Sequence, residues 1–327
     1  MHHCANLCCE FNKASFMFGS TSRSPLRGHA AAAVLAVAAL DPAGVAFAQE
    51  SDTLVGALRV HITSFEDTLP ELARRYGVGY TQLAAANPGV DPWLPGAGTE
   101  ILVPTASLLP DAPRAGIVVN LAELRIYRFG SDGRVEATYP IGIGRQGFTT
   151  PLGSTTVVRR QKDPVWFPTE SARMDNPVLP TAVPPGPDNP LGSHALYLGW
   201  PSYLLHGTNK PWGIGRRVSR GCLRLYPEDI ASLYASVAIG TPVTVVHQPV
   251  KTGWHEGRLY LEIHPSEAQS ERIENGERPG FEAIADLAGI VQAAAGMHAA
   301  RLDWSVIEQA QIERRGIPVA VTPFVGS

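Results

Sequence analysis

The chain is poor in cysteine, in long apolar runs and in net charge. It has 4 cysteines among 327 residues, and Cys4, Cys8 and Cys9 all fall within the first ten positions. Beyond that segment Cys222 has no second thiol with which to form an internal disulfide, so stability must come from an apolar core. A lone thiol is either a small buried apolar side chain or a group kept for its chemistry.

No apolar run reaches the length of about 20 residues that a membrane span needs. The run at residues 30–40 follows two arginines and leads to a small-x-small sequence that ends at Ala48. This pattern is typical of a cleavable secretory signal. We therefore expect a signal peptide at 1–48, cleavage after Ala48 and export to the periplasm. Starts at Met1 and at Met17 both remain open.

The charges are nearly balanced, with 27 Lys and Arg against 30 Asp and Glu and a formal net charge of −3. Nucleic-acid-binding domains carry a basic excess, so we predict no nucleic-acid partner. Attraction of the whole chain to an anionic membrane is excluded for the same reason. The length beyond the signal suffices for roughly two domains.

Residues 56–104 have the pattern strand, helix, helix, strand. Residues 59–63 alternate like a strand, and the segment from Thr68 to Glu71 is a capping box with proline in the first helical turn. A second short helix is expected at 81–86, and 101–104 close the unit as a strand. The sequence thus predicts a small α+β (βααβ) domain.

A linker at 105–114 leads to a region rich in short strands. Few helical windows interrupt it, so we predict a mainly β domain at 115–249, an antiparallel sandwich or barrel. The expected strands are 116–120, 123–129, 135–143, 155–160, 196–198 and 243–247. Residues 250–327 form a partly helical C-terminal extension, with a strand at 259–263, helices near 281–295 and 303–315, and no motif that indicates a function.

Residues 142–147 match the G-x-G-x-x-G pattern of dinucleotide-binding loops. That pattern requires a helix to begin there, whereas a turn sequence containing Pro151 follows. We reject a nucleotide site and predict no cofactor. The proline-rich segment 176–192 is expected to form an ordered surface excursion or lid.

Chemistry-bearing residues gather before and around the lone thiol. His206 and Gly207 precede it, and Ser219, Gly221 and Cys222 belong to the sequence S-R-G-C-L-R. A thiol attacks as the thiolate, which nearby cations favour by lowering the thiol pKa. Five cations lie within fifteen residues: Lys210, Arg216, Arg217, Arg220 and Arg224. Gly221 lets the backbone turn its N–H groups towards a developing oxyanion.

A zinc site is the alternative for the histidines. His194, His247, His255 and His264 would have to join Cys222, but their spacing matches no known ligand pattern. We predict no metal.

The H-G-T-N and S-x-G-C-x-R sequences, sixteen residues apart from His206 to Cys222, resemble those of the YkuD-type L,D-transpeptidases. The likeness extends to segments 116–125, 139–144, 150–153 and 185–192, which resemble the enterobacterial periplasmic branch of that family. Segment 56–104 is similar to a LysM module, which precedes the catalytic domain in that branch. LysM modules bind glycans such as peptidoglycan strands. Glu66 departs from their pattern, where glycine is common.

The resemblance implies a cysteine-dependent acyltransferase acting on peptidoglycan. Cys222 would attack the diamino acid carbonyl of a tetrapeptide stem and release D-alanine, with His206 as general base and the Gly207 carbonyl orienting its ring. An amine would then take the acyl group, either in a 3–3 crosslink or on an outer-membrane protein or lipoprotein. The residues expected to bind substrate or shape the loop are Gly221, Arg224, Ser219, Arg220 and Trp212.

Two other functions stay open at this point. A hydrolase of the same fold would resolve the thioester with water, acting as an L,D-carboxypeptidase or endopeptidase. A non-catalytic peptidoglycan-binding protein would not form the thioester. The sequence leaves the acceptor, the oligomeric state and the role of residues 250–327 undetermined.

Overall fold

The computed structural model describes residues 53–145, 147–219 and 221–325. The expected signal peptide and Arg220 lie outside these ranges. No helix in the described ranges is both long and apolar enough to cross a lipid bilayer.

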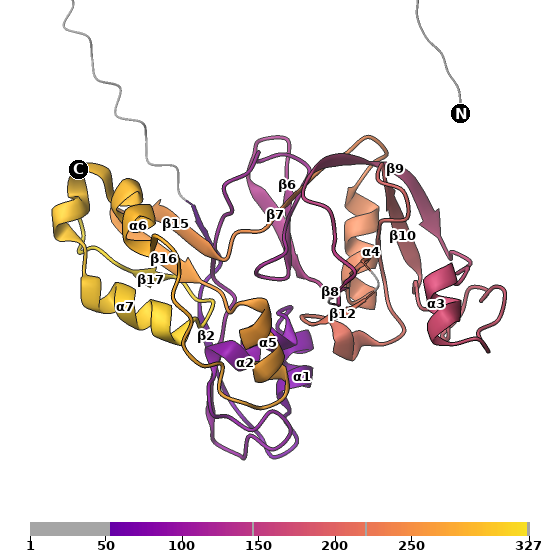
Figure 1. Cartoon of the computed structure of the whole chain (residues 1–327), viewed down its shortest axis with the longest axis horizontal. Coiled ribbons are helices and arrows are strands. Elements are labelled where there is room, and N and C mark those ends of the chain that lie inside the picture. Colours follow the sequence, from indigo (N-terminus) through magenta and orange to yellow (C-terminus); the bar gives the residue numbers. More distant parts are fainter. Residues whose placement is uncertain (1–52, 146, 220, 326–327) are drawn as a thin grey trace, which may run out of the picture. The chain divides into compact units, whose positions relative to one another are not determined.

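The first unit after the signal has the predicted order strand, helix, helix, strand (Figure 1). Its elements are β2 (Arg59–Ile62), α1 (Leu69–Arg75), α2 (Tyr80–Ala86) and β3 (Glu100–Val103). The side chain of Thr68 caps α1 by accepting a hydrogen bond from the Glu71 amide. β2 and β3 pair antiparallel, and the helices bury Leu69, Leu72 and Leu83 against them. The limits 56–104 as a separate domain stay a prediction.

The central element is a curled sheet of eight strands in the order β13-β11-β10-β9-β14-β5-β6-β7. The strands are β5 (Ile117–Asn120), β6 (Arg125–Phe129), β7 (Val135–Pro140), β9 (Gly153–Lys162), β10 (His194–Leu198), β11 (Leu204–His206), β13 (Leu223–Arg224) and β14 (Pro242–Val246). The predicted mainly β fold is confirmed.

The sheet is mainly antiparallel, as predicted, but two of its pairings are parallel. β14 lies parallel to β5, and β13 lies parallel to β11, while the other pairs are antiparallel. A parallel pair needs a long crossover between its strands, and strand-forming residues alone do not reveal where such a crossover leads.

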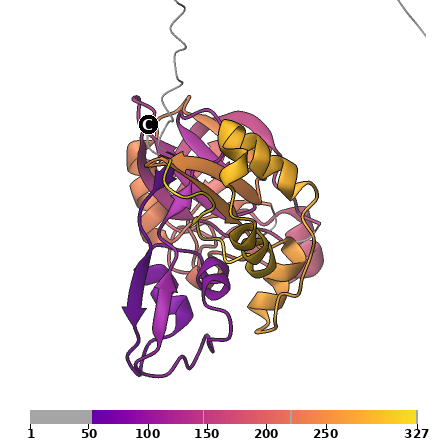
Figure 2. The same ribbon diagram turned by 90° about the vertical axis from the view of Figure 1, so that its left-hand side faces the viewer.

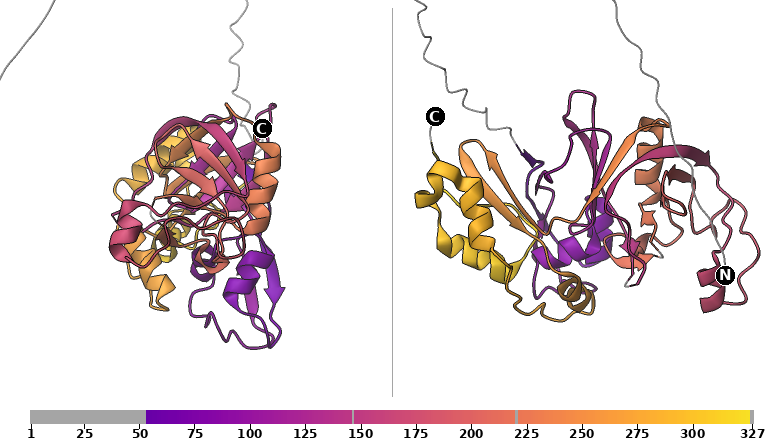
Figure 3. Two further views of the ribbon diagram at one scale, coloured as in Figure 1. Left: turned by 90° about the vertical axis from the view of Figure 1, so that its right-hand side faces the viewer. Right: turned by 45° about the horizontal axis from the view of Figure 1, so that its top comes forward.

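Both faces of the sheet are covered at β5 and β6. Strand alternation sends Ile117 and Val119 to one face, where α4 (Pro227–Ser236) contributes Ile230 and Leu233 to the same core. Val118 points to the other face, into a smaller cluster with residues of the 105–114 segment. β9 and β10 curve as a ribbon towards the segment that carries α3 (Glu170–Asp175) (Figure 3).

Short elements complete the chain between these strands and around the expected linker. They are β1 (Leu54–Val55), β4 (Ser107–Leu108), β8 (Ile143–Gly144), η1 (Pro211–Gly213) and β12 (Arg217–Ser219). β1 pairs with β4 and β8 pairs with β12. No helix begins within 142–145 or 147–153, as expected for a segment that only imitates a nucleotide-binding loop.

The C-terminal extension has its own core. It comprises β15 (Val250–His255), β16 (Arg258–Ile263), α5 (Glu267–Glu274), α6 (Leu287–Ala295), η2 (Gly296–Arg301), α7 (Trp304–Glu313) and β17 (Val319–Ala320). α6 and α7 pack on the three-stranded sheet of β15, β16 and β17 (Figure 2). α6 begins at Leu287 and not near 281, because Asp286 has a left-handed backbone (φ 53°) that interrupts the helix.

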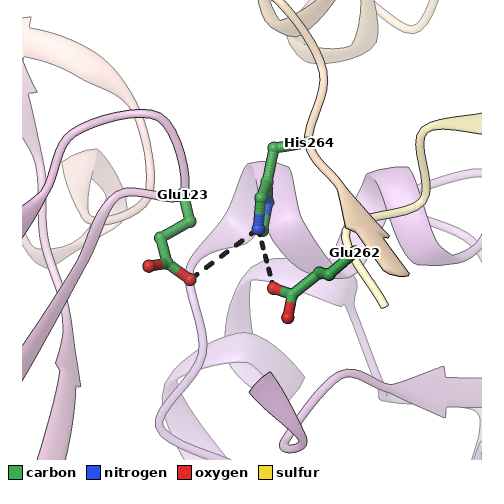
Figure 4. Close-up of side chains that lie close together, drawn as sticks. All are labelled: Glu123, Glu262 and His264. Carbon is green, nitrogen blue, oxygen red and sulfur yellow. Dashed lines mark hydrogen bonds and ion pairs between the residues drawn. The ribbon is translucent and has the colours of Figure 1, made fainter. Parts of the chain in front are cut away.

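A buried ion network joins this extension to the eight-stranded sheet (Figure 4). The Lys251 Nζ lies 2.6 Å from Glu123 Oε2, 3.0 Å from Glu262 Oε1 and 2.6 Å from the Leu108 carbonyl oxygen. His264 Nε2 lies 2.7 Å from Glu262 Oε1. Burial alone would lower the pKa of Lys251, but the two carboxylates outweigh it and raise that pKa.

The same network contains the ligand types of a metal site. Glu123, Glu262 and His264 are the candidate cluster of this kind within the described residues. The Lys251 ammonium stands between the two carboxylates and supplies the positive charge that a metal ion would bring. We therefore interpret the cluster as an ion network that holds segments together.

Replacing Lys251 with methionine is expected to lower the free energy of unfolding by about 3 to 5 kcal/mol, since it leaves two buried carboxylates without a cation. Urea denaturation of the chain from residue 49 measures this loss. Lys162→Met, at an exposed position, is the matched control. A loss below about 1 kcal/mol for Lys251→Met would show that the network does not stabilise the fold.

Candidate active site

Strand pairing brings His206 and Cys222 to one face of the sheet. β11 and β13 are parallel, with Leu205 opposite Leu223 and His206 opposite Arg224. Leu205 and Leu223 point into the core, so their neighbours point to the other face. Cys222 directly precedes β13 and therefore lies on the same side as His206.

The imidazole of His206 is held by its own backbone. Nδ1 lies 2.7 Å from the carbonyl oxygen of Gly207, which can only accept a hydrogen bond. Nδ1 therefore carries the proton, and Nε2 keeps a free lone pair that can act as a base. The ring is buried, and burial together with the Arg224 guanidinium lowers the His206 pKa to about 3. At neutral pH His206 is therefore uncharged, with its Nε2 unprotonated.

The environment of Cys222 differs from the sequence-based expectation. Burial raises the pKa of the thiol, although the Leu204 amide and the Arg224 guanidinium act in the opposite direction. The Sγ donates to the carbonyl oxygen of Ser202 at 3.5 Å, and no direct hydrogen bond joins it to His206 among the described residues. The expected lowering of the thiol pKa was wrong, so the resting pair is a neutral thiol beside a neutral imidazole.

The turn before Cys222 requires glycine. Gly221 has φ +99°, a conformation that side chains disfavour, and a Cβ there would lie 3.4 Å from the Tyr203 ring. Thr150 Oγ1 donates to the Gly221 carbonyl at 3.0 Å, and Tyr203 donates to the Thr149 carbonyl at 3.0 Å. The hydrogen bond from Thr150 thereby holds the Gly221 carbonyl in place. The sequence alone did not predict a role for Tyr203, because no local motif surrounds it. It did not predict one for Thr150 either, although the T-P-x-G motif that begins there could have indicated it.

Ser219 and Arg224 flank the nucleophile. Ser219 is buried, and its Oγ donates to the Cys222 carbonyl at 2.6 Å, which supports the interpretation that it orients the loop. Arg224 exchanges two backbone hydrogen bonds with Gly142, of 2.8 and 2.9 Å. These contacts fix the chain on both sides of Cys222.

Among the described residues, the other cations of the loop are not among the groups that shift the thiol pKa. The Cζ of Arg216 lies 3.9 Å from the centroid of the Tyr80 ring. The Nη1 of Arg217 lies 3.9 Å from the Oε2 of Glu267. The side chain of Lys210 is exposed. Arg224 is the described cation that shifts the thiol pKa. Arg220 lies outside the described residues.

Trp212 belongs to the turn η1 in the segment between β11 and β12. Its side chain is 54% exposed, so it is accessible to a ligand. No contact between Trp212 and Cys222 is recorded in the described part of the chain, and its substrate-binding role stays a prediction.

Three of the four histidines considered as zinc ligands are engaged elsewhere. His194 contacts Ser193 and Tyr234, His255 packs on Tyr260, and His264 belongs to the ion network. The described residues thus give no support for a zinc site that includes Cys222.

Comparison with known proteins identifies the family of this chain. Residues 114–245 match the family described as the L,D-transpeptidase catalytic domain, YkuD. Probable L,D-transpeptidase YcfS of Escherichia coli K12 is 42% identical over 232 residues, which are 68% of this chain and 72% of that protein. Probable L,D-transpeptidase YbiS of the same strain is 39% identical over 279 residues, covering 83% of this chain and 89% of that protein.

The chain belongs to the L,D-transpeptidase family. It is an L,D-transpeptidase and so an acyltransferase, as the resemblance implied. Among solved structures, L,D-transpeptidase 3 from Mycobacterium tuberculosis overlaps with 45% of this chain and 67% of that chain, at 20% identity and a TM-score of 0.35. An overlap of this size supports no argument about the site.

The raised thiol pKa predicts that Cys222 reacts faster as the pH rises. The rate of alkylation by iodoacetamide should increase through and above pH 8.5, without a step near pH 6.5 where an ordinary histidine titrates. Arg224→Gln should shift the curve to higher pH, because the guanidinium favours the thiolate. The rate is measured on the chain from residue 49, in which Cys222 is the single cysteine.

Arg134→Gln changes an exposed arginine and is the control. A curve that levels off below pH 7 would contradict the neutral resting pair.

Proposed function

We propose that Cys222 is the nucleophile of this L,D-transpeptidase and His206 its general base. The observation that supports the proposal is the parallel pairing of β11 and β13, by which the lone thiol lies on the same side of the sheet as an imidazole whose proton is on Nδ1. The Gly207 carbonyl orients the imidazole, in the position that a carboxylate has in other triads.

The first half of the reaction takes the acyl group. Nε2 of His206 removes the thiol proton as Sγ attacks the diamino acid carbonyl of a tetrapeptide stem. The new S–C bond forms and the C–N bond to D-alanine breaks. D-Alanine leaves as the amine after it receives the proton from the imidazolium. Backbone N–H groups at the Gly221 turn stabilise the tetrahedral oxyanion.

The second half transfers the acyl group to an amine. The amine nitrogen attacks the thioester carbonyl, the N–C bond forms, and the C–S bond breaks with its electrons on Sγ. The proton from nitrogen passes to His206 and then to the thiolate. The product is either a 3–3 crosslink between stems or a protein joined to peptidoglycan.

Cys222→Ala should abolish covalent labelling by a carbapenem, measured as a mass adduct on the intact protein. His206→Gln should keep the thiol but slow labelling by about 100-fold, because the thiol loses its base. His255→Gln, on β15 of the extension, is the matched control. A wild-type protein that forms no adduct would favour a non-catalytic wall-binding protein.

A labelled disaccharide tetrapeptide separates the transferase from the hydrolase. Crosslinked dimer or an amine-exchanged product is expected. Release of tripeptide alone, with an amine present, would favour an L,D-carboxypeptidase.

We further propose that the 56–104 unit is a LysM-like module that binds glycan strands of peptidoglycan. Two adjacent loops of this unit expose large apolar side chains. The hydrogen bond from the Leu69 amide to the Pro92 carbonyl, at 2.8 Å, joins the two loops. Phe65 is 83% exposed, Trp93 60% and Leu94 75%. Exposed apolar groups that cluster at one end of a unit are typical of a binding surface, and aromatic rings suit the apolar faces of sugars.

Trp93→Ala and Phe65→Ala should each weaken binding to purified peptidoglycan by about fivefold, which corresponds to the loss of one aromatic contact. Sedimentation with insoluble peptidoglycan measures the binding. Phe281→Ala is the matched control, since Phe281 is an aromatic side chain of the extension and is 61% exposed. Equal binding by all variants would assign glycan recognition to another surface.

Peptidoglycan as substrate, together with the expected signal at 1–48, supports a location in the periplasm. We therefore include cleavage after Ala48 in the proposal.

A further inference from the structure

The LysM-like unit contacts the chain on both sides of Cys222. Before the thiol, the Tyr80 amide at the start of α2 donates to the Ile214 carbonyl at 3.3 Å. After the thiol, the Tyr226 hydroxyl donates to the Val78 carbonyl at 3.4 Å. The four residues that form these two hydrogen bonds are buried. The unit therefore holds both ends of the segment that carries the thiol.

The contact before the thiol is a close packing of two backbones. A Cβ at Gly79 would lie 2.8 Å from Gly215 Cα, and a Cβ at Gly215 would lie 2.3 Å from the Tyr80 amide nitrogen. Gly215 also has φ +80°, a conformation that side chains disfavour. The turn before α2 therefore fits against residue 215 only because both positions lack a side chain.

Two arginines strengthen the contacts on the two sides of the thiol. The Cζ of Arg216 lies 3.9 Å from the centroid of the buried Tyr80 ring. A guanidinium is attracted to the face of an aromatic ring, and more strongly where water is excluded. After the thiol, Arg74 of α1 binds Glu228 of α4 through two contacts of 2.8 and 2.9 Å. Both helices of the LysM-like unit thus contact the catalytic domain near its nucleophile.

Hydrogen bonds lead from this contact to the nucleophile. The Arg216 carbonyl accepts a hydrogen bond from the Ile143 amide of β8 at 3.0 Å. β12 follows directly, and its last residue, Ser219, donates to the Cys222 carbonyl at 2.6 Å. β8 and the LysM-like unit together hold the segment that ends in this bond. A displacement of residues 214–216 would therefore reach the carbonyl of the nucleophile through one short strand.

We propose that the LysM-like unit positions the nucleophile loop, with Gly79 and Tyr80 as the positioning residues. The inference rests on the proposed function of Cys222. Acylation of the thiol then depends on this contact even when the substrate has no glycan, because the contact acts on the loop and not on the substrate. A displaced loop would misalign Sγ with the His206 imidazole, and small misplacements of reacting groups cost large factors in rate.

A carbapenem tests the proposal, because it acylates the thiol and contains no glycan. The maximal rate of adduct formation is measured by mass on the chain from residue 49. Gly79→Ala places a methyl group against Gly215, in a backbone conformation (φ −77°) that alanine adopts readily. This variant and Tyr80→Leu should each lower the maximal rate by about tenfold, without a change in the carbapenem concentration at half-maximal rate. Tyr80→Phe keeps the ring beneath Arg216 and should restore the wild-type rate.

Alkylation by iodoacetamide separates positioning from stability. Local unfolding would expose Cys222 and speed its alkylation, whereas a small displacement of a folded loop would not. We therefore expect no faster alkylation in Gly79→Ala or Tyr80→Leu. Gly130→Ala is the matched control, because its added methyl group would meet only the ends of the Glu136 and Asp132 side chains, away from the nucleophile loop.

A maximal rate equal to that of Gly130→Ala in both variants would overturn the positioning role and leave the proposed function standing. Slower adduct formation accompanied by faster alkylation would also overturn it, because unfolding would then explain the loss. A wild-type protein without an adduct at Cys222 would overturn the proposed function itself.

Discussion

The parallel pairing of β11 with β13 is the constraint on which the candidate site depends. It aligns His206 with Arg224 and buries Leu205 with Leu223 beneath them. The apolar side chains fix the register, because a shift by one residue would turn the leucines out of the core and the reacting groups into it. The chemistry on one face is thus held in place by packing on the other.

Burial by the same core sets the electrostatics of the site. His206 loses basicity, with a pKa of about 3, and the thiol becomes harder to ionise. A neutral pair protects a lone cysteine from oxidation, since the thiolate is the form that oxidants attack. In the proposed mechanism, proton transfer from Cys222 to His206 must therefore accompany the attack of Sγ.

The parts of the chain are joined by polar contacts that the apolar pattern does not reveal. The Lys251 network ties the linker, the sheet and the extension through Leu108, Glu123 and Glu262. The Arg74 side chain on α1 forms a two-pronged ion pair with Glu228 on α4, with distances of 2.8 and 2.9 Å. Thr81 on α2 donates to Glu274 on α5 at 2.8 Å. A LysM-like unit attached in this way would present glycan at a fixed place relative to Cys222.

The sequence by itself determined the elements whose cause is local. Capping at Thr68, strand alternation around Val118 and the motif that contains His206 and Cys222 can all be read along the chain, because they depend on near neighbours. Tertiary structure decided the rest. It set the two parallel pairings, the direction of the thiol pKa and the partners of Lys251 and Arg217. These features depend on groups that are distant in sequence. Five nearby cations were expected to lower the thiol pKa, but burial raises it, because only Arg224 among the described cations acts in the expected direction.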